Sequence, residues 1–119
     1  MKAHERLLKY VSYRTPSDEN SETSPSSQCQ FSLAHALVDD LKELGVEDAA
    51  CDEYCYVYGH IPATPGKEHV TAIGFCSHMD TVSDYCDHDA NPQIIENYDG
   101  GVVKLGDSGL VLDPEVFPH

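Results

Sequence analysis

A histidine and an aspartate stand one residue apart where an apolar run ends, in residues 73–81, IGFCSHMDT. An imidazole such as that of His78 is a good zinc ligand. A carboxylate two residues further along, here Asp80, can hydrogen-bond the other ring nitrogen, which orients the ligand and raises its basicity. The spacing therefore allows metal chemistry. A bare His-x-Asp pattern also arises by chance, however, and one zinc ion needs about four donors.

The location of this pair favours metal chemistry over two polar residues that merely end a strand. Residues 70–76, VTAIGFC, are an almost unbroken apolar run of strand length, which is typical of a strand covered on both faces. In open α/β sheets, ligands bind beyond the carboxyl ends of the strands. His78 and Asp80 follow the predicted strand at that end.

A structural zinc site is a second arrangement that the residue types allow. Cys-x-His occurs twice, at residues 76–78 and 86–88, and Cys51 and Cys55 lie upstream. Zinc-site cysteines usually come as closely spaced pairs matched by a second pair, and Cys76 lies in an apolar run where a packing role is expected. The pattern leaves a Cys/His zinc-binding module as an alternative to a catalytic site.

A short amphipathic helix is expected over residues 2–13, KAHERLLKYVSY. Its leucines and valine fall on one stripe, and its charged residues lie elsewhere around the turn. The next segment, residues 15–27, contains no large apolar side chain and is crowded with Ser, Asp and Glu. This composition predicts a polar loop.

A longer helix is predicted between a cap at Ser24, with Pro25 at the first helical position, and a stop at Gly45. His35 lies beside its apolar face and is interpreted as a structural residue. That face recurs at helical spacing and is expected in the core. It consists of Phe31, Ala34, Leu37, Val38, Leu41 and Leu44.

Strands are predicted over residues 54–61, YCYVYGHI, and over residues 70–76, and the two are expected to pair. The order helix, helix, strand, strand indicates an α/β fold with a mixed sheet flanked by helices. The remaining residues offer Ile94 and Ile95 as core candidates and a short hairpin around residues 107–109, DSG. Such a long stretch without a clear helix is unusual for a self-contained α/β domain.

Composition narrows the possible classes of function. The chain of 119 residues allows at most one ordinary domain, and its formal net charge of −14 disfavours nucleic acid and anionic membranes as partners. The N-terminus lacks the apolar core of a secretory signal, and no run reaches the roughly 18 apolar residues of a membrane span. We therefore expect a cytoplasmic protein. The odd count of 5 cysteines favours reduced thiols over disulfides.

The sequence resembles the N-terminal segment of the peptidase T family, zinc-dependent tripeptide aminopeptidases within the wider group of two-zinc exopeptidases. The strand followed by His-x-Asp-Thr is shared by the wider group, and NPQIIENYDGG is the more specific mark of the family. The resemblance runs through ERLLKYVSYRTPSDENSETSPSS, LVDDLKELGVED, IPATPG, AIGFCSHMDT, NPQIIENYDGG and VLDPEVFPH.

This resemblance implies that His78 is a ligand of one of two zinc ions and that Asp80 is the active-site carboxylate that orients it. It implies release of the N-terminal residue from tripeptides by a water molecule that two metal ions activate. Two features depart from the family pattern: Val102 follows a Gly-Gly pair where an acidic residue is common, and the cysteine count is high.

The resemblance also implies that residues 1–119 are the N-terminal portion of a catalytic domain, without its inserted smaller domain. In the family, the carboxylate that bridges the metals, the general base and the other ligands lie downstream of the matching segment. The chain alone is therefore expected to be inactive, and an inert truncated fragment is the remaining alternative.

Overall fold

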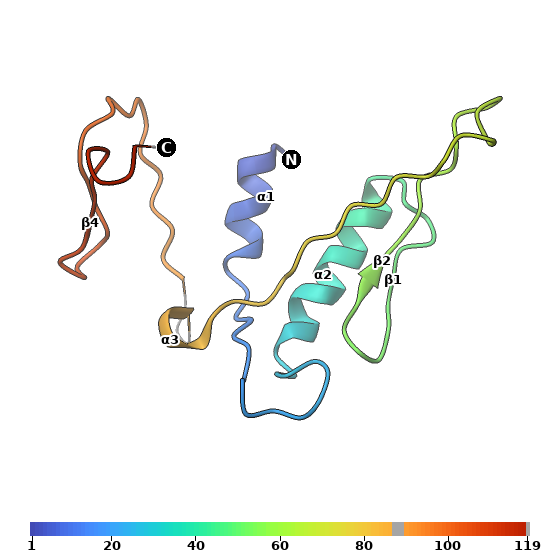
Figure 1. Ribbon diagram of the computed structural model, residues 1–119, viewed down its shortest axis with the longest axis horizontal. Coiled ribbons are helices and arrows are strands. Elements are labelled where there is room, and N and C mark those ends of the chain that lie inside the picture. The colour runs from blue at the N-terminus through green and yellow to red at the C-terminus, as the bar shows by residue number, and fades with distance from the viewer. Residues whose placement is uncertain (87–89, 119) are drawn as a thin grey trace.

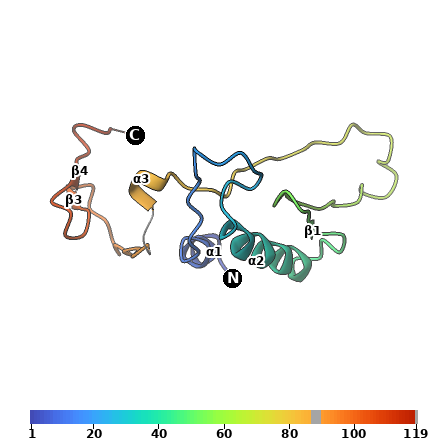
Figure 2. The ribbon, with the colours of Figure 1, turned by 90° about the horizontal axis from the view of Figure 1, so that it is seen from below.

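The computed structural model describes residues 1–86 and 90–118, and this part of the chain has mixed α/β structure. Helices α1 and α2 lie side by side, a small hairpin packs on α2, and a second hairpin stands apart near the C-terminus (Figures 1 and 2). The helices are α1 (Ala3–Tyr10), α2 (Gln30–Glu43) and α3 (Ser83–Cys86). The strands are β1 (Ala50–Cys51), β2 (Val57–Tyr58), β3 (Val103–Lys104) and β4 (Val111–Leu112). In the described residues, no helix is long and apolar enough to cross a membrane.

Helix α1 confirms the first predicted helix, although it ends at Tyr10 rather than Tyr13. The Glu5 carboxylate accepts a hydrogen bond from the backbone N–H of Lys2 at 2.6 Å and so satisfies one free donor at the N-terminus. No residue of this helix is buried, and Leu7 is 61% exposed. Its apolar stripe is therefore only partly covered.

Helix α2 ends where the sequence predicts. Gly45 follows the last turn with φ of 93°, a left-handed conformation that glycine adopts without a steric cost. Its N–H donates to the carbonyl of Lys42, and the N–H of Val46 donates to the carbonyl of Leu41, both at 2.9 Å. These two bonds are those of a Schellman motif.

The predicted start of α2 is wrong, because the helix begins at Gln30 and not beside Ser24. Ser24 caps no helix: its hydroxyl donates to the carbonyl of Tyr54 at 3.3 Å, and the bond from Ser24 to Pro25 is cis. Tight turns then carry the chain into the helix, with the N–H of Gln30 bonded to the carbonyl of Ser27 at 3.2 Å. The tertiary contact of Ser24 outweighs its local capping preference.

A short hairpin after α2 contains part of the core. Strand β2 lies within the predicted strand 54–61, but it pairs antiparallel with β1 and not with residues 70–76, which corrects the expected pairing. This hairpin packs against α2. Of the predicted face of α2, Ala34 is buried, Leu44 is exposed, and the other members are intermediate. The buried apolar residues are Leu33, Ala34, Val46, Ala49 and Cys55.

Residues 70–76 do not form the buried strand that their composition predicts. The segment is extended and crosses the view of Figure 1, yet no strand of the described chain pairs with it. Ile73 is 83% exposed and Phe75 is 97% exposed. An apolar run becomes a buried strand only where neighbouring strands and helices cover it, and the described residues provide no such neighbours.

The C-terminal part of the described chain holds the hairpin predicted around residues 107–109. Strands β3 and β4 pair antiparallel, and the N–H of Leu105 donates to the carbonyl of Leu110 at 2.9 Å. The two core candidates are wrong, since Ile94 is 70% and Ile95 is 51% exposed. Helix α3 was not predicted, and it is only four residues long.

Candidate functional site

The His-x-Asp pair forms a direct contact on the extended segment after residues 70–76. The Nδ1 atom of His78 lies 3.1 Å from Oδ1 of Asp80, and the two side chains are 83% and 43% exposed. An ionised carboxylate only accepts hydrogen bonds, so a neutral imidazole beside it carries its proton on Nδ1 and its lone pair on Nε2. This is the arrangement of a metal-binding histidine with its supporting carboxylate.

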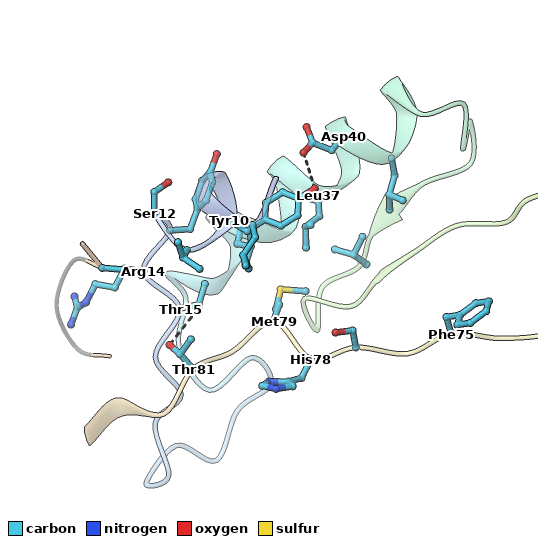
Figure 3. Close-up of a pocket in the computed structure, with 18 of the residues that line it drawn as sticks. Tyr10, Ser12, Arg14, Thr15, Leu37, Asp40, Phe75, His78, Met79 and Thr81 are labelled. Carbon is cyan, nitrogen blue, oxygen red and sulfur yellow. Dashed lines mark hydrogen bonds between the residues drawn. The ribbon is translucent and has the colours of Figure 1, made fainter. Parts of the chain in front are cut away.

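Backbone conformation explains how the segment presents these side chains. Successive side chains of an extended chain point to opposite sides. Met79 accordingly points toward the helices while His78 points away from them (Figure 3). His78 and Asp80 share the other side, which brings ring and carboxylate together.

A cavity of about 720 Å³ lies between the helices and this segment. It is lined mainly by apolar side chains, and His78 borders it together with Ser77 and Thr81 (Figure 3). Such a cavity gives a bound molecule an apolar wall beside a few polar groups, as small-molecule sites do. Its apolar lining includes Leu7, Tyr10, Leu33, Leu37, Phe75 and Met79.

The loop before α2 is hydrogen-bonded to the chain just after Asp80. Pro16 and Thr81 form a parallel bridge. The N–H of Thr81 donates to the carbonyl of Thr15 at 2.9 Å, and the N–H of Ser17 donates to the carbonyl of Thr81 at 2.8 Å. Sequence reasoning treated residues 15–27 as a polar loop and missed this contact, because no local pattern reveals a bond across more than sixty residues.

Asp40 is a buried carboxylate on the edge of the cavity, and it joins the two helices. It is 5% exposed and accepts hydrogen bonds from Lys9 Nζ at 2.6 Å and Tyr10 Oη at 2.9 Å. Arg6 Nη1 lies 3.5 Å from the same carboxylate. The bonds from Lys9 and Tyr10 lower the pKa of Asp40, and the bond to Asp40 raises the pKa of Lys9. The apolar stripes of the helices gave no sign of this cluster.

A second His–Asp pair lies on the surface near the first hairpin. Nδ1 of His60 lies 2.6 Å from Oδ2 of Asp48, and the His60 side chain is 82% exposed. The His60 N–H also donates to Asp48 at 2.8 Å, and these bonds, the backbone bond first, lower the pKa of Asp48. The two residues are twelve apart in sequence, so spacing could not reveal them.

Comparison with known proteins matches nearly the whole chain to several proteins named peptidase T. No family model matches it. A protein named peptidase T from Caldanaerobacter subterraneus is 47% identical over 119 residues, 99% of this chain and 29% of that protein. Peptidase T of Bacillus licheniformis is 45% identical over 116 residues, 97% of this chain and 28% of its own length. Peptidase T of Aliivibrio fischeri is 45% identical over 114 residues.

The chain is homologous to peptidase T. This confirms the resemblance found in the sequence, and the coverage is that of an N-terminal fragment of peptidase T. The chain spans less than a third of the length of these relatives, 28% and 29% of the first two. The chain therefore corresponds to only a part of these relatives.

The donors present fit part of a metal site and not a complete one. Among the side chains that the structure describes, no three of His, Cys, Asp or Glu are grouped so that they could hold a metal ion. The pair at His78 supplies one nitrogen donor, with Asp80 bonded to its other side. A metal centre built on this pair would thus need ligands beyond it.

The cysteines do not assemble the alternative zinc module in the described part of the chain. Cys55 is buried, which raises its pKa to about 11, and burial also raises the pKa of Cys51. No group of three metal-binding side chains includes them in the described part of the chain. Cys76 is exposed and not packed, contrary to expectation. The Cys86 side chain and His88 lie outside what the structure describes.

Proposed function

We propose that the protein to which this chain belongs is a zinc-dependent aminopeptidase that releases the N-terminal residue from tripeptides. The homology to proteins named peptidase T supports peptidase activity. The observation that carries the metal assignment is the bond between His78 Nδ1 and Asp80, which leaves Nε2 free to bind an ion.

In this proposal the two residues have separate roles. His78 binds one zinc ion through Nε2. Asp80 accepts the Nδ1 proton, which keeps the neutral ring in one tautomer and one orientation. Two bound zinc ions would lower the pKa of a water molecule so that hydroxide is available near neutral pH.

Residues 1–119 serve in this proposal as the N-terminal portion of the catalytic domain. One histidine and its supporting carboxylate cannot hold two zinc ions, so further ligands and a general base come from residues outside the described part of this chain. The chain alone should then lack peptidase activity.

The test uses the protein translated from the full reading frame. Purified protein is assayed with a tripeptide, a dipeptide and a longer peptide, before and after removal of metal with a chelator and return of zinc. The proposal expects release of the N-terminal residue from the tripeptide, loss of activity without metal, and recovery with zinc. Turnover that persists after metal removal, or internal cleavage of the longer peptide with no action on tripeptides, would contradict it.

A further inference from the structure

Residues 15–17, Thr-Pro-Ser, hold the chain at the residue that follows Asp80. Three hydrogen bonds join them to Thr81: Thr81 N–H to the Thr15 carbonyl at 2.9 Å, Ser17 N–H to the Thr81 carbonyl at 2.8 Å, and Ser17 Oγ to that carbonyl at 3.1 Å. The hydroxyls of Thr15 and Thr81 approach to 3.5 Å and point toward each other (Figure 3). Thr81 is thus fixed by its N–H and its carbonyl together.

These three residues are themselves fastened to the core. Thr15 is 3% exposed, and Pro16 is buried. Gln30, the first residue of α2 and 6% exposed, donates from Nε2 to the carbonyl of Pro16 at 3.3 Å. Contacts therefore run from α2 through the loop to Thr81.

The metal-binding pair needs such an anchor because little else holds it. The segment before it has no strand partner in the described chain, and the ring of His78 is 83% exposed. An extended chain spans at most about 3.6 Å per residue, so His78 lies within about 11 Å of the fixed Thr81. Fixing Thr81 limits where the free Nε2 atom can point.

We propose that residues 15–17 are a positioning clamp for His78 and Asp80. Because they hold Thr81, the His78–Asp80 hydrogen bond is already formed in the metal-free protein. The conformational entropy of ordering the ligand is then lost on folding and not on metal binding. The catalytic consequence of the clamp rests on the proposed function. Its structural consequence does not.

The structural test is made by nuclear magnetic resonance on metal-free protein from the full reading frame. Ser17→Pro removes both donors to Thr81, whereas Ser17→Thr keeps both. Ser12→Ala is the matched control, since Ser12 lines the same cavity but donates to the carbonyl of Lys9. The measurements are the ring-nitrogen shifts of His78, which report its tautomer, and backbone relaxation of residues 78–80.

The wild type, Ser17→Thr and Ser12→Ala should show one tautomer, protonated at Nδ1. Ser17→Pro should show a mixture of tautomers and backbone order parameters that fall below about 0.6 at residues 78–80. Unchanged tautomer and order parameters in Ser17→Pro, with the signals of α2 intact, would overturn the clamp. If Ser17→Pro does not fold, Ser17→Ala is the deciding variant, because it loses only the side-chain donor. It should show the same changes in tautomer and order parameters, but smaller. Values equal to those of the wild type would overturn the proposal.

The catalytic test is made on zinc-loaded protein from the full reading frame. Ser17→Pro should lower kcat for a tripeptide by about tenfold, the low end for partners that orient a metal ligand, and leave KM nearly unchanged. Ser17→Thr should restore kcat. A wild-type protein without peptidase activity would refute the proposed function. The clamp would then be decided by the magnetic resonance test alone. Unchanged kcat in an active, folded Ser17→Pro protein would overturn the clamp.

Discussion

In the described part of the chain, two histidines contact a carboxylate through Nδ1, and they differ in their surroundings. His78 and His60 are equally exposed, at 83% and 82%. The first lies at the border of the cavity beside a fixed residue, Thr81, whereas the second lies on the surface beside the first hairpin. The same bond should therefore have a catalytic consequence at only one of them.

His78→Ala in the full-length protein should nearly abolish tripeptide turnover and lower the zinc content, because it removes a ligand of one of the two zinc ions. Asp80→Ala should weaken metal affinity or activity by about 10- to 100-fold, because the ring loses the group that orients it. His60→Ala is the control, since it breaks a similar His–Asp bond elsewhere and should leave both quantities unchanged. Zinc content and initial rates of the three variants measure this. Loss of zinc in His60→Ala with His78→Ala unaffected would place the metal elsewhere.

At the scale of elements, α1 depends on the charge of Asp40. Helix α1 buries no side chain, and its bonds to α2 converge on this one carboxylate from Lys9, Tyr10 and Arg6. A charged group that sits among cations loses much of its stabilising effect when it is neutralised. The position of α1 should thus respond to pH.

The pKa of Asp40 is lowered in the fold from an ordinary value of 3.8, so its stabilisation is present above pH 3.8 and is lost as pH falls through the lower folded value. The pKa of Lys9 is raised from 10.5, so its stabilisation is present below pH 10.5 and is lost as pH rises through the higher folded value. We expect α1 to separate from α2 on acidification below about pH 4 before α2 unfolds.

This prediction is followed through the amide signals of α1 and α2 in a pH titration. Asp40→Asn should separate α1 already at neutral pH and lower the Tm. Asp39→Asn is the matched control, because Asp39 is the adjacent aspartate on the exposed side of α2. An α1 that stays docked at a pH low enough to protonate Asp40, or in Asp40→Asn, would show that apolar contacts alone hold it.

The first hairpin depends on the close approach of Gly59 to the turn after α2. A Cβ atom at Gly59 would lie 2.6 Å from Val46 Cγ1 and 3.2 Å from the Ala49 Cα. Gly59→Ala should therefore destabilise the fold by about 1–3 kcal/mol, the usual cost of overpacking. Gly74→Ala, where no atom lies within 4 Å of the added carbon, should change stability little. Urea unfolding of both variants measures the difference, and equal midpoints would contradict this packing.

At the scale of the whole molecule, the chain is open. Its radius of gyration is 18.2 Å, whereas a compact domain of this length has about 13.5 Å. Its accessible surface is 9917 Å², against about 6400 Å² for a compact monomer of this mass. Residues 70–76 and the C-terminal part contribute to this extra surface, because large apolar side chains are exposed there.

The 119-residue chain on its own should therefore be marginally stable, self-associate and show no peptidase activity. The unpaired apolar segment at residues 70–76 is the expected contact, because an exposed strand edge pairs with other chains. Phe75→Lys should reduce association by adding charge there, and Phe117→Lys, a change of the same type at another exposed phenylalanine, should reduce it less. Sedimentation at increasing concentration and a thermal melt measure this. A cooperative monomer would contradict it, and so would zinc-dependent turnover that His78→Ala abolishes.

The sequence by itself determined the features whose signals are local. The stop of α2 at Gly45 and the hairpin around residues 107–109 need only a backbone that can turn there, and both are confirmed. The relationship to peptidase T also followed from short stretches of sequence. The contact between His78 and Asp80 follows from the alternation of side chains along an extended chain, while their role in metal binding stays a prediction.

Tertiary structure decided what depends on distant partners. An apolar composition does not say whether a strand finds neighbours, so residues 70–76 were predicted buried and are exposed. Ser24 has a local preference for capping, but it contacts Tyr54 thirty residues away. The bonds of residues 15–17 to Thr81 join segments more than sixty residues apart. Pairing at such separations depends on how the whole chain packs, and no local pattern of residue types encodes it.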